Sequence, residues 1–488
     1  MFKAPLLVLG ALLSTSAYPA VTQAQFIVNA YYGDTPATTQ LSSLISSGAT
    51  SHLTHLTYAF AGSDGNSNPC TSAPAAMNAT DLKNLKAQNP NVKILISVGG
   101  ENSGPVFTNA LKQSASTFAS SCVNTLMGSF PGYVDGIDID WEFPESGTDE
   151  QNFNALLAAF RTALDTYAQQ NNITEHLLLT AAIGPEDTTN GWEFIDFTGA
   201  TYAPGANSSV DFYNVEFYNY AYGPDGVTES DAPIHDINND IFGNPNAYGA
   251  AGLIPVGGVP ASKIVVGIPF YGVHYTGVTN GTQLGQPGTL DPSANGTPPY
   301  YQIVNILSGG GYTNYSDTDG SAWSWNSSSG DFYEYDNGNT IGQKTTYAQS
   351  NQLGGIFAWN LQDDTTTGTL LSATPAPPTA PYTNVTGSVS VTALTGMAYN
   401  RLKHTGSEVL SIMNTSGQTI NGPIQLVLSG LPEGVTPTNN TGTFNGNPYW
   451  MVTANSITPG SAVEVTITLS YTGSFSITTT PTVYSGNF

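Results

Sequence analysis

The chain has 488 residues, of which 35 are Asp or Glu and only 10 are Lys or Arg, so its formal net charge at pH 7 is -25. Nucleic acids and anionic membrane surfaces bind clusters of cationic side chains, so this composition excludes both as partners and favours a neutral or cationic ligand. The length exceeds that of a usual single core and predicts a large domain with a smaller one appended, in a chain that we expect to be a monomer.

Charged residues make up only 9% of the chain, which leaves few salt bridges to form. Salt bridges are lost when carboxylates take up protons, so a chain with few of them has little to lose in acid. We therefore expect the stability of the fold to depend only weakly on acid, as in a protein adapted to acidic surroundings.

The first 24 residues are typical of a secretory signal peptide. Lys3 precedes an apolar run over residues 6–13, and small residues follow at the two positions that a signal peptidase recognises, Thr22 and Ala24. The run is too short to span a bilayer, and no later segment approaches the ~20 consecutive apolar residues of a membrane helix. We therefore expect a soluble, secreted, extracellular protein that has no membrane partner.

Two cysteines are present, Cys70 and Cys122. In an oxidising exterior they can form a disulfide, although the sequence does not show whether their Cα atoms come within bridging range. A disulfide is favoured slightly over two buried thiols.

Eight apolar runs typical of strands alternate with helical segments along residues 25–371. Strands that alternate with helices pair in parallel, so the pattern predicts a closed (β/α)8 TIM barrel, an α/β fold. The predicted strands are residues 26–32, 56–61, 92–98, 133–142, 177–183, 210–218, 263–271 and 353–361. After the fourth strand, apolar residues recur at helical spacing from Phe153 to Leu164, behind an acidic start at Asp149 and Glu150.

The remaining length forms an insertion, a linker and a second domain. Residues 273–336 are rich in Gly, Tyr and Asn and lack clear helical periodicity, so we expect a small α+β insertion, rich in strands, between the seventh and eighth strands. Four prolines in residues 372–383 indicate a stiff linker. Residues 384–488 alternate short Thr- and Val-rich runs with turns, which predicts a β-sandwich, in which Trp450 is either a sugar-binding platform or part of a plain spacer.

One strand carries the chemistry, because in residues 135–142 acids alternate with Ile, Ile and Trp. Successive strand side chains point to opposite sides, so Asp138, Asp140 and Glu142 share one face. Three crowded acids do not all ionise, and one carboxyl is then held protonated, as an acid catalyst requires. Calcium loops place Gly and Asn between their acids, and an exposed ladder of like charges repels, so we expect neither a metal site nor a structural ladder.

These residues resemble glycoside hydrolase family 18, the chitinases and related endo-N-acetylglucosaminidases, over most of residues 26–370. The family pattern Asp-Gly-x-Asp-x-Asp-x-Glu is complete at residues 135–142. Ser97-Val98-Gly99-Gly100 resembles the family's Ser-x-Gly-Gly element, residues 267–272 resemble its seventh strand, and residues 354–359 resemble its eighth, which ends on a tryptophan. Four such elements in the family's order are a specific match.

The resemblance implies roles for four catalytic residues. Glu142 would protonate the glycosidic oxygen and later activate water. The nucleophile of this family is the substrate's own 2-acetamido oxygen, so the anomeric configuration is retained. Asp140 would hold the acetamido N–H and stabilise the oxazolinium intermediate, Asp138 would share a proton with Asp140, and the hydroxyl of Tyr218 would orient the acetamido carbonyl.

The resemblance also implies a set of substrate-binding residues at the strand ends, where sugar C–H groups pack on aromatic faces. They are Tyr31, Phe60, Gly99, Gly100, Glu216, Asn219 and Trp359. The chain departs from many chitinases in having Glu101 where they carry Trp, Asn219 where they carry Asp and Glu216 where they carry Met, although plant-type members also carry Phe-Tyr-Asn here. The departures concern the leaving-group side of the cleft.

The expected function is that of a secreted chitinase that hydrolyses β-1,4-linked N-acetylglucosamine and needs no cofactor. The first alternative is an endo-β-N-acetylglucosaminidase acting on glycoprotein N-glycans, although an insertion that deepens the cleft favours linear chitin. The second alternative is a non-hydrolytic chitin-binding lectin, against which the presence of Glu142 argues. The expected ligand in each case contains N-acetylglucosamine.

Overall fold

The computed structural model describes residues 26–486, apart from a set of short gaps. The gaps are residues 34–39, 174, 186–190, 222–225, 235–253, 255, 294–295, 377–381, 402, 433, 445–446, 454 and 473–478. The expected signal peptide (residues 1–24) and part of the expected linker therefore lie outside the described residues.

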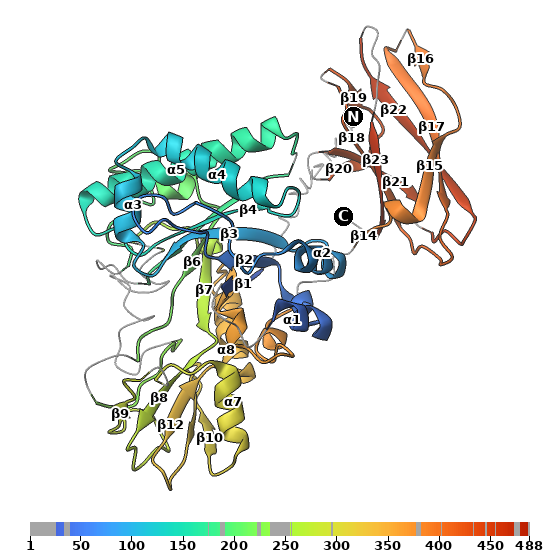
Figure 1. Ribbon diagram of the computed structural model, residues 1–488. Coiled ribbons are helices and arrows are strands. Elements are labelled where there is room, and N and C mark those ends of the chain that lie inside the picture. Colours follow the sequence, from blue (N-terminus) through green and yellow to red (C-terminus); the bar gives the residue numbers. More distant parts are fainter. Residues whose placement is uncertain are drawn as a thin grey trace, which may run out of the picture.

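Eight parallel strands form a closed barrel, which confirms the predicted fold class (Figure 1). Around the barrel the order is β1-β13-β7-β6-β5-β4-β3-β2. The strands are β1 (Ile27–Gly33), β2 (His55–Ala59), β3 (Lys93–Gly100), β4 (Gly136–Trp141), β5 (Leu178–Ile183), β6 (Phe212–Val215), β7 (Ile264–Pro269) and β13 (Gly355–Trp359). All except β1 and β3 are shorter than predicted. β4 ends at Trp141 and β6 ends at Val215, so Glu142 and Glu216 lie just beyond their strands.

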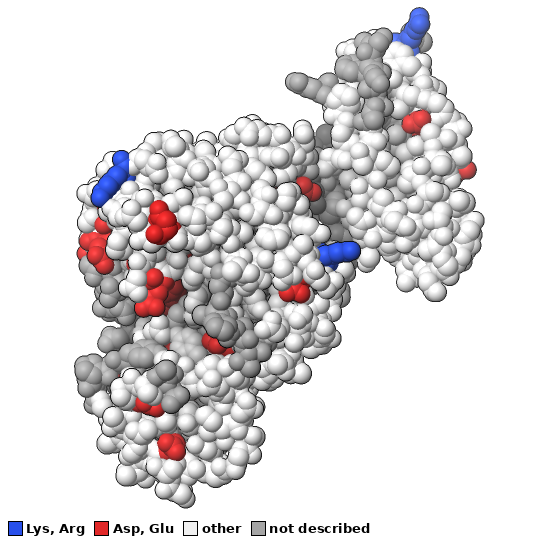
Figure 2. Space-filling view, in the orientation of Figure 1, with Lys and Arg blue, Asp and Glu red and all other residues white. Residues whose placement is uncertain are grey.

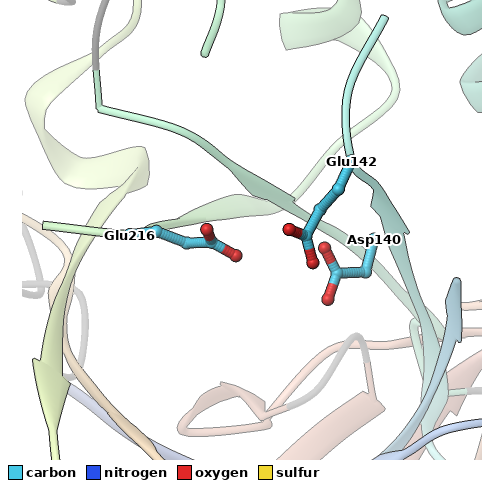
Figure 3. A group of neighbouring side chains, drawn as sticks. All are labelled: Asp140, Glu142 and Glu216. Atoms are coloured by element: carbon cyan, nitrogen blue, oxygen red, sulfur yellow. The ribbon is translucent and has the colours of Figure 1, made fainter. Parts of the chain in front are cut away.

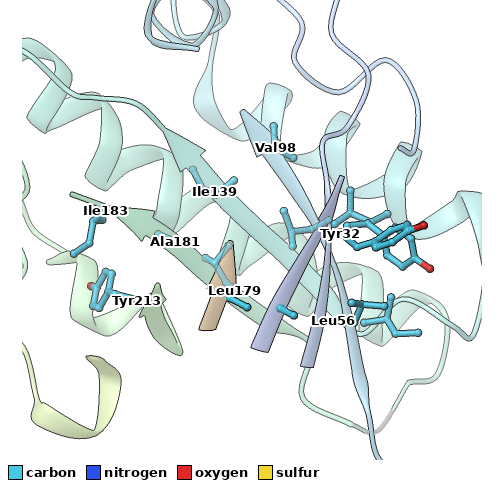
Figure 4. Close-up of a cluster of buried hydrophobic side chains, with 14 of the residues drawn as sticks. Tyr32, Leu56, Val98, Ile139, Leu179, Ala181, Ile183 and Tyr213 are labelled. Carbon is cyan, nitrogen blue, oxygen red and sulfur yellow. The ribbon is translucent and has the colours of Figure 1, made fainter. Parts of the chain in front are cut away.

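Helices cover the outside of the barrel and bury its outward side chains (Figure 4). The α-helices are α1 (Leu41–Ser47), α2 (Ala79–Gln88), α3 (Gly104–Ala110), α4 (Ala115–Ser129), α5 (Gly147–Gln170) and α8 (Gly338–Ser350). Short 3-10 helices are η1 (Ala49–His52), η2 (Ala206–Ser208), η3 (Ala261–Lys263), η4 (Leu361–Asp363) and η5 (Leu371–Ala373). Among the described residues, the β5–β6 connection holds only η2.

The alternation of β4 fixes its two faces as the sequence predicts. Ile137, Ile139 and Trp141 point outward and are at most 1% exposed. The indole of Trp141 stacks on Phe107 of α3 with ring centroids 5.1 Å apart, and meets Phe153 of α5 edge-on. This packing holds the opposite face of β4, with its acids, toward the barrel axis.

Helix α5 follows the predicted pattern. Ser146 caps its first turn by accepting a hydrogen bond from the backbone N–H of Asp149. Two acids in that turn face the positive end of the helix dipole. The predicted apolar positions, from Phe153 to Leu164, are buried against the barrel.

The insertion between β7 and α8 is a five-stranded antiparallel sheet in the order β10-β11-β12-β8-β9, with one helix (Figure 1). Its elements are β8 (Gly272–Thr276), β9 (Thr289–Leu290), α7 (Tyr300–Ser308), β10 (Thr313–Ser316), β11 (Ala322–Trp325) and β12 (Phe332–Tyr335). The periodicity of the sequence did not predict α7, whose short apolar face buries Tyr300 and Ile303.

Buried polar contacts join this sheet to the barrel. Ser230, in the segment after β6, donates to the carboxylate of Glu334 on β12 over 3.2 Å. Immediately beyond β12, Asp336 accepts two hydrogen bonds of 2.6 and 2.5 Å from Nζ of Lys344 on α8. The side chains of this ion pair are only 3% and 4% exposed, so it lies within the interior.

The C-terminal part of the chain forms two antiparallel sheets with a core of their own. Their strands are β14 (Tyr382–Asn384), β15 (Val389–Ala393), β16 (Ala398–Asn400), β17 (Thr405–Asn414), β18 (Ile424–Ser429), β19 (Thr436–Pro437), β20 (Gly442–Phe444), β21 (Asn447–Thr453), β22 (Ala462–Ser470) and β23 (Thr480–Gly486). A short 3-10 helix, η6 (Thr386–Ser388), precedes β15. Trp450 is 2% exposed and its indole N–H bonds Asn439, so it is a core residue and not a platform for sugar.

A disulfide joins Cys70 to Cys122, whose Cα atoms are 5.2 Å apart. It ties the loop between β2 and α2 to α4. Within the described part of the chain, no helix combines the length and the apolar character needed to cross a membrane. Basic side chains are few and well separated on the face shown in Figure 2.

Candidate active site

A cleft of about 520 Å³ opens at the carboxyl ends of the barrel strands. Its lining residues come from the ends of the strands and from the insertion: Phe60, Glu101, Asp140, Glu142, Glu216, Tyr218, Asn219, Tyr271, Thr297, Pro299, Trp359 and Asp363. Five of these residues carry a carboxyl group and none is Lys or Arg. The structure thus gathers seven of the eleven catalytic and substrate-binding residues expected from the sequence in one acidic cleft. Asp138 and Tyr31 are not among the lining residues; both are buried and hydrogen-bond each other.

Asp138 lies in the barrel interior and is surrounded by hydrogen-bond donors. The hydroxyls of Tyr31 and Ser97 donate to its Oδ2 over 2.9 and 2.7 Å. Thr180 and the Asn214 amide donate to Oδ1 over 2.5 and 3.3 Å. Burial raises the pKa of Asp138, and these four hydrogen bonds oppose the rise because they stabilise the ionised form.

Asp140 lies two residues further along the same face of β4, but its surroundings differ from those of Asp138. It is 3% exposed, and its buried Oδ1 has no hydrogen-bond partner among the described residues. Burial, and then the charges of Glu142, Glu216 and Asp138, raise its pKa well above the ordinary value. The described structure contains no hydrogen bond between Asp138 and Asp140, so the proton sharing expected for this pair is not direct here.

Glu142 follows β4 and is half-buried. Its backbone N–H donates to the hydroxyl of Ser103, which donates in turn to the carbonyl of Asp140, and these bonds hold the end of the strand. Burial is the first cause that raises the pKa of Glu142, to about 7, and the charge of Glu101 is the second. A carboxyl group with this pKa keeps its proton in mildly acidic solution, as a general acid requires.

Glu216, beyond β6, points toward Glu142 and Asp140 (Figure 3). One carboxylate oxygen from each of the three lies within 4.8 Å of the others. Burial and the charges of Glu142 and Asp138 raise the pKa of Glu216 well above the ordinary value. Three such oxygens could also ligate a hard cation, and among the described residues this is the only group of acids, histidines or cysteines so close together.

Aromatic rings line the cleft beside the acids. Trp359, at the end of β13, lies with its ring centroid 5.4 Å from that of Tyr31 and 5.8 Å from that of Phe60. Tyr218, which also lines the cleft, meets the ring of Tyr271 edge-on. The hydroxyl of Tyr271 donates to the side-chain oxygen of Asn219, over 2.5 Å.

Gly99 and Gly100 are not among the cleft-lining residues, although both were expected at the substrate. Both have positive φ, of 124° and 97°. A Cβ on Gly99 would lie 1.8 Å from the carbonyl oxygen of Asp140, and one on Gly100 would lie 2.6 Å from the ring of Phe60. These glycines therefore let β3 approach β4 and Phe60 closely.

Several residues of the site were not predicted. Thr180 and Asn214 bond Asp138 from β5 and β6, and only the register of neighbouring strands reveals this. Thr297 and Pro299 reach the cleft from the insertion. Asp363 had a sequence signal, since it follows Trp359 by four residues at the end of the last barrel strand.

Asp363 is unusual among the acids of the cleft. Burial raises its pKa to about 7, with no other cause. Its carboxylate has no hydrogen-bond or ion-pair partner in the described part of the chain. A carboxylate that is removed from water without a partner is costly, and such groups are common where a ligand supplies the partner.

Comparison with known proteins supplies a family. The profile described as "Glycosyl hydrolases family 18" matches residues 28–364. Chitinase A1 of Niallia circulans is 31% identical over 324 residues, which cover 60% of this chain and 43% of the relative. Chitinase 63 of Streptomyces plicatus is 31% identical over 318 residues, 62% of this chain and 48% of that protein. The chain thus spans about half the length of these relatives.

Solved structures agree on the barrel. The catalytic domain of the psychrophilic chitinase B from Arthrobacter TAD20 matches with a TM-score of 0.57 and 25% identity, over 72% of this chain and 98% of that one. A chitinase-like agglutinin from Robinia pseudoacacia matches with a TM-score of 0.57 and 26% identity, over 71% of this chain and 98% of its own. The same barrel therefore occurs in proteins described as an enzyme and as an agglutinin.

Proposed function

Since the chain belongs to glycosyl hydrolase family 18, we propose that it is a chitinase that hydrolyses the β-1,4 linkages of N-acetylglucosamine polymers with retention of configuration. The observation that carries the proposal is the pairing of Glu142, whose pKa is raised to about 7, with the unpartnered buried oxygen of Asp140 in one cleft. The first group can supply a proton and the second can accept an N–H.

In the first step, Glu142 gives its proton to the glycosidic oxygen as the bond from C1 to that oxygen breaks. The carbonyl oxygen of the substrate's 2-acetamido group attacks C1 and forms a cyclic oxazolinium ion. The leaving sugar departs as an alcohol, and Glu142 is left as a carboxylate. In the second step, that carboxylate takes a proton from water, the water oxygen bonds to C1, and the ring opens to restore the amide.

Asp140 accepts the amide N–H in this mechanism and stabilises the positive charge that develops on the ring. The proton that its raised pKa keeps in the free enzyme is released to solvent as the substrate binds, so Asp140 accepts the N–H as a carboxylate. Below it, the four donors of Asp138 keep a second negative charge close to the developing cation. Tyr218 lines the same cleft, and its hydroxyl is proposed to hold the amide carbonyl.

Glu216 lies near enough to Glu142 to suggest a protein nucleophile instead. A carboxyl group attacks C1 only in its ionised form, however, and the pKa of Glu216 is raised well above the ordinary value. A neutral carboxyl group is suited to hydrogen bonding with the sugar. This supports attack by the substrate amide.

Two alternative functions would use the same cleft. An endo-β-N-acetylglucosaminidase needs an open approach for branched glycans, and Thr297 and Pro299 of the insertion form a wall beside the acids, which favours a linear chain. A chitin-binding lectin has the agglutinin likeness in its favour. The presence of Glu142, whose pKa is raised, favours hydrolysis over binding alone.

Three substrates in parallel test the proposal: chitin hexaose, cellohexaose, and a glycoprotein with high-mannose glycans. We expect rapid cleavage of chitin hexaose only, because cellohexaose lacks the amide and the glycoprotein lacks a linear chain. Equal rates on cellohexaose would overturn the substrate-assisted mechanism. Cleavage of the glycoprotein alone would establish the first alternative, and binding of chitin hexaose without cleavage would establish the lectin.

We propose further that the protein is secreted and works as a monomer. The Cys70–Cys122 disulfide supports secretion, because disulfides persist outside the reducing cytosol. Release of the protein into the medium by its producing cells and the mass of the purified protein in light scattering test these two points. Retention in the cell, or a dimer mass, would contradict them.

A further inference from the structure

The charge of the cleft exceeds what an uncharged polymer requires. Glu101 and Asp363 line the cleft together with Asp140, Glu142 and Glu216, and none of the described lining residues is Lys or Arg. Three of these acids act on the sugar in the proposed reaction, whereas Asp363 has no part in it and Glu101 only helps to raise the pKa of Glu142. The question is which ligand group they face.

Asp363 lies in η4, four residues after Trp359, and lines the same cleft as that tryptophan. Its desolvated carboxylate has no partner in the described structure, and its pKa is raised to about 7 by burial alone. A cationic group of the ligand would favour the ionised form and offset the cost of desolvation. A hydroxyl group of the ligand would offset less of this cost, because it brings no positive charge to the carboxylate of Asp363.

Glu101 follows β3 and lies near the general acid, whose pKa its charge helps to raise. The register of the adjacent strands β3 and β4 pairs Gly100 with Trp141, and Glu101 and Glu142 are the first residues beyond these two strand ends. Since Glu142 protonates the leaving oxygen, Glu101 faces the leaving sugar. Its side chain is exposed, so a partner there comes from solvent or from the ligand.

A further observation, which does not depend on charge, concerns the sugar unit between those that Asp363 and Glu101 face. Asp140 lines the cleft although it is only 3% exposed, and its buried Oδ1, which has no partner among the described residues, requires a hydrogen-bond donor. In the proposed reaction this donor is an amide N–H, so the central unit must be acetylated. The neighbouring units have no such requirement and can carry a free amine.

We propose that Glu101 and Asp363 are specificity residues that bind the ammonium groups of glucosamine units, so that partially deacetylated chitin is a favoured substrate. Asp363 binds the unit that precedes the central N-acetylglucosamine, and Glu101 binds the leaving unit. This inference rests on the proposed chitinase function and extends its substrate class to cationic copolymers.

The test is digestion of chitosan with about half of its units acetylated, at pH 6, followed by sequencing of the products by mass spectrometry. We expect every new reducing end to be N-acetylglucosamine. Glucosamine should be enriched above the substrate average at the unit before that end and at the new non-reducing end. Glucosamine at the substrate average in both positions would overturn the proposal.

Two variants separate the two acids. Asp363→Asn should reduce the enrichment before the new reducing end, and Glu101→Gln should reduce it at the new non-reducing end, each by about two- to fivefold, as for one ion pair near solvent. Each variant is the control for the other position, and Glu145→Gln, an exposed acid outside the lining set, should change neither. Enrichment that persists in both variants would contradict the assignment.

Salt and a fully acetylated substrate complete the design. Raised salt should weaken the enrichment, more at Glu101 than at the less exposed Asp363, because exposed charges are screened more strongly. Enrichment that does not respond to salt at either position would oppose an ionic origin. A wild-type protein that fails to cleave chitin hexaose would refute the proposed function itself, whereas cleavage of the hexaose without enrichment would refute only this inference.

Discussion

Asp138 and Asp140 are two residues apart on one face of β4, yet the first carboxylate accepts four hydrogen bonds whereas Oδ1 of the second accepts none within the described structure. The pair is therefore asymmetric. Burial raises the pKa of both carboxyl groups, but hydrogen bonds oppose the rise at Asp138 whereas neighbouring charges add to it at Asp140. The unpartnered oxygen is the one that can accept a donor from the substrate.

Glu142→Gln should lower kcat on chitin hexaose by about 10²–10⁴-fold, because the amide cannot give up a proton as the acid does. Binding of the hexaose, measured by calorimetry, should persist, since the amide has nearly the same shape. Glu145→Gln changes an exposed acid three residues away and should keep the wild-type rate. Near-normal turnover by the Glu142→Gln protein would show that another group is the acid.

Activity should fall as the pH rises through about 7, because Glu142 must enter the reaction protonated. The kcat/KM profile on chitin hexaose measures this limb. Because the charge of Glu101 contributes to the high pKa, Glu101→Gln should move the limb to lower pH. A limb that stays in place in that variant would remove Glu101 from the electrostatics of the acid.

Tyr31→Phe removes one of the four donors to Asp138. A hydrogen bond to a charged group contributes about 1.5–3 kcal/mol, so the free energy of unfolding should fall by this amount. The pKa of Asp138 should rise, and kcat should fall because a protonated Asp138 no longer stabilises the developing cation. Urea denaturation measures the first effect. Tyr32→Phe, on the outward face of the same strand, removes a hydroxyl that bonds the backbone of Leu41 and should leave kcat near the wild-type value. Equal losses of kcat in both variants would argue against a specific role for the Tyr31 hydroxyl.

The free energy of unfolding should be higher at pH 4–5 than at pH 8. The pKa values of Glu142 and Asp363 are raised to about 7 in the fold, from 4.5 and 3.8. The folded state therefore binds more protons than the unfolded chain between pH 4 and 7, so these groups stabilise the fold below that window and the contribution is lost as the pH rises through 7.

Urea denaturation between pH 4 and 8 measures whether the free energy of unfolding falls as the pH rises. Asp363→Asn should flatten the dependence, because a pKa difference of one between the two states corresponds to about 1.4 kcal/mol. The sequence alone predicted weak dependence on acid because salt bridges are few. The buried carboxyl groups add a preference for acid, and maximal stability at pH 8 would contradict it.

The barrel was predictable because its strands and helices have different apolar periods. The apolar residues of β4 and α5 are buried where their patterns place them. The outward face of β4 packs against the helices, and the apolar face of α5 packs against the barrel. The end of β6 was not predictable, because the apolar run continues past Val215 while the chain turns toward Asn219, whose φ is positive. The position of α7 within the expected α+β insertion was not predicted, because its apolar face is short and begins directly after two prolines.

The acids on β4 were predictable for the same reason that the strand was, since a period of two places them on one face. Their partners were not. Thr180 and Asn214 approach Asp138 only through the parallel register of β4, β5 and β6, and a register between distant segments leaves no mark in any one of them. Asp363 joins the cleft because the barrel closes between β1 and β13.

The ion pair between Asp336 and Lys344 limits how the wall of the cleft can move. The insertion cannot swing away from α8 without separating two charges that lie out of water, and breaking such a pair costs about 3–5 kcal/mol. Amide protons in β12 and in the first turns of α8 should therefore exchange with deuterium together, as one cooperative unit. The groove that holds the polymer would then be rigid on this side, and a long chain would have to thread along it.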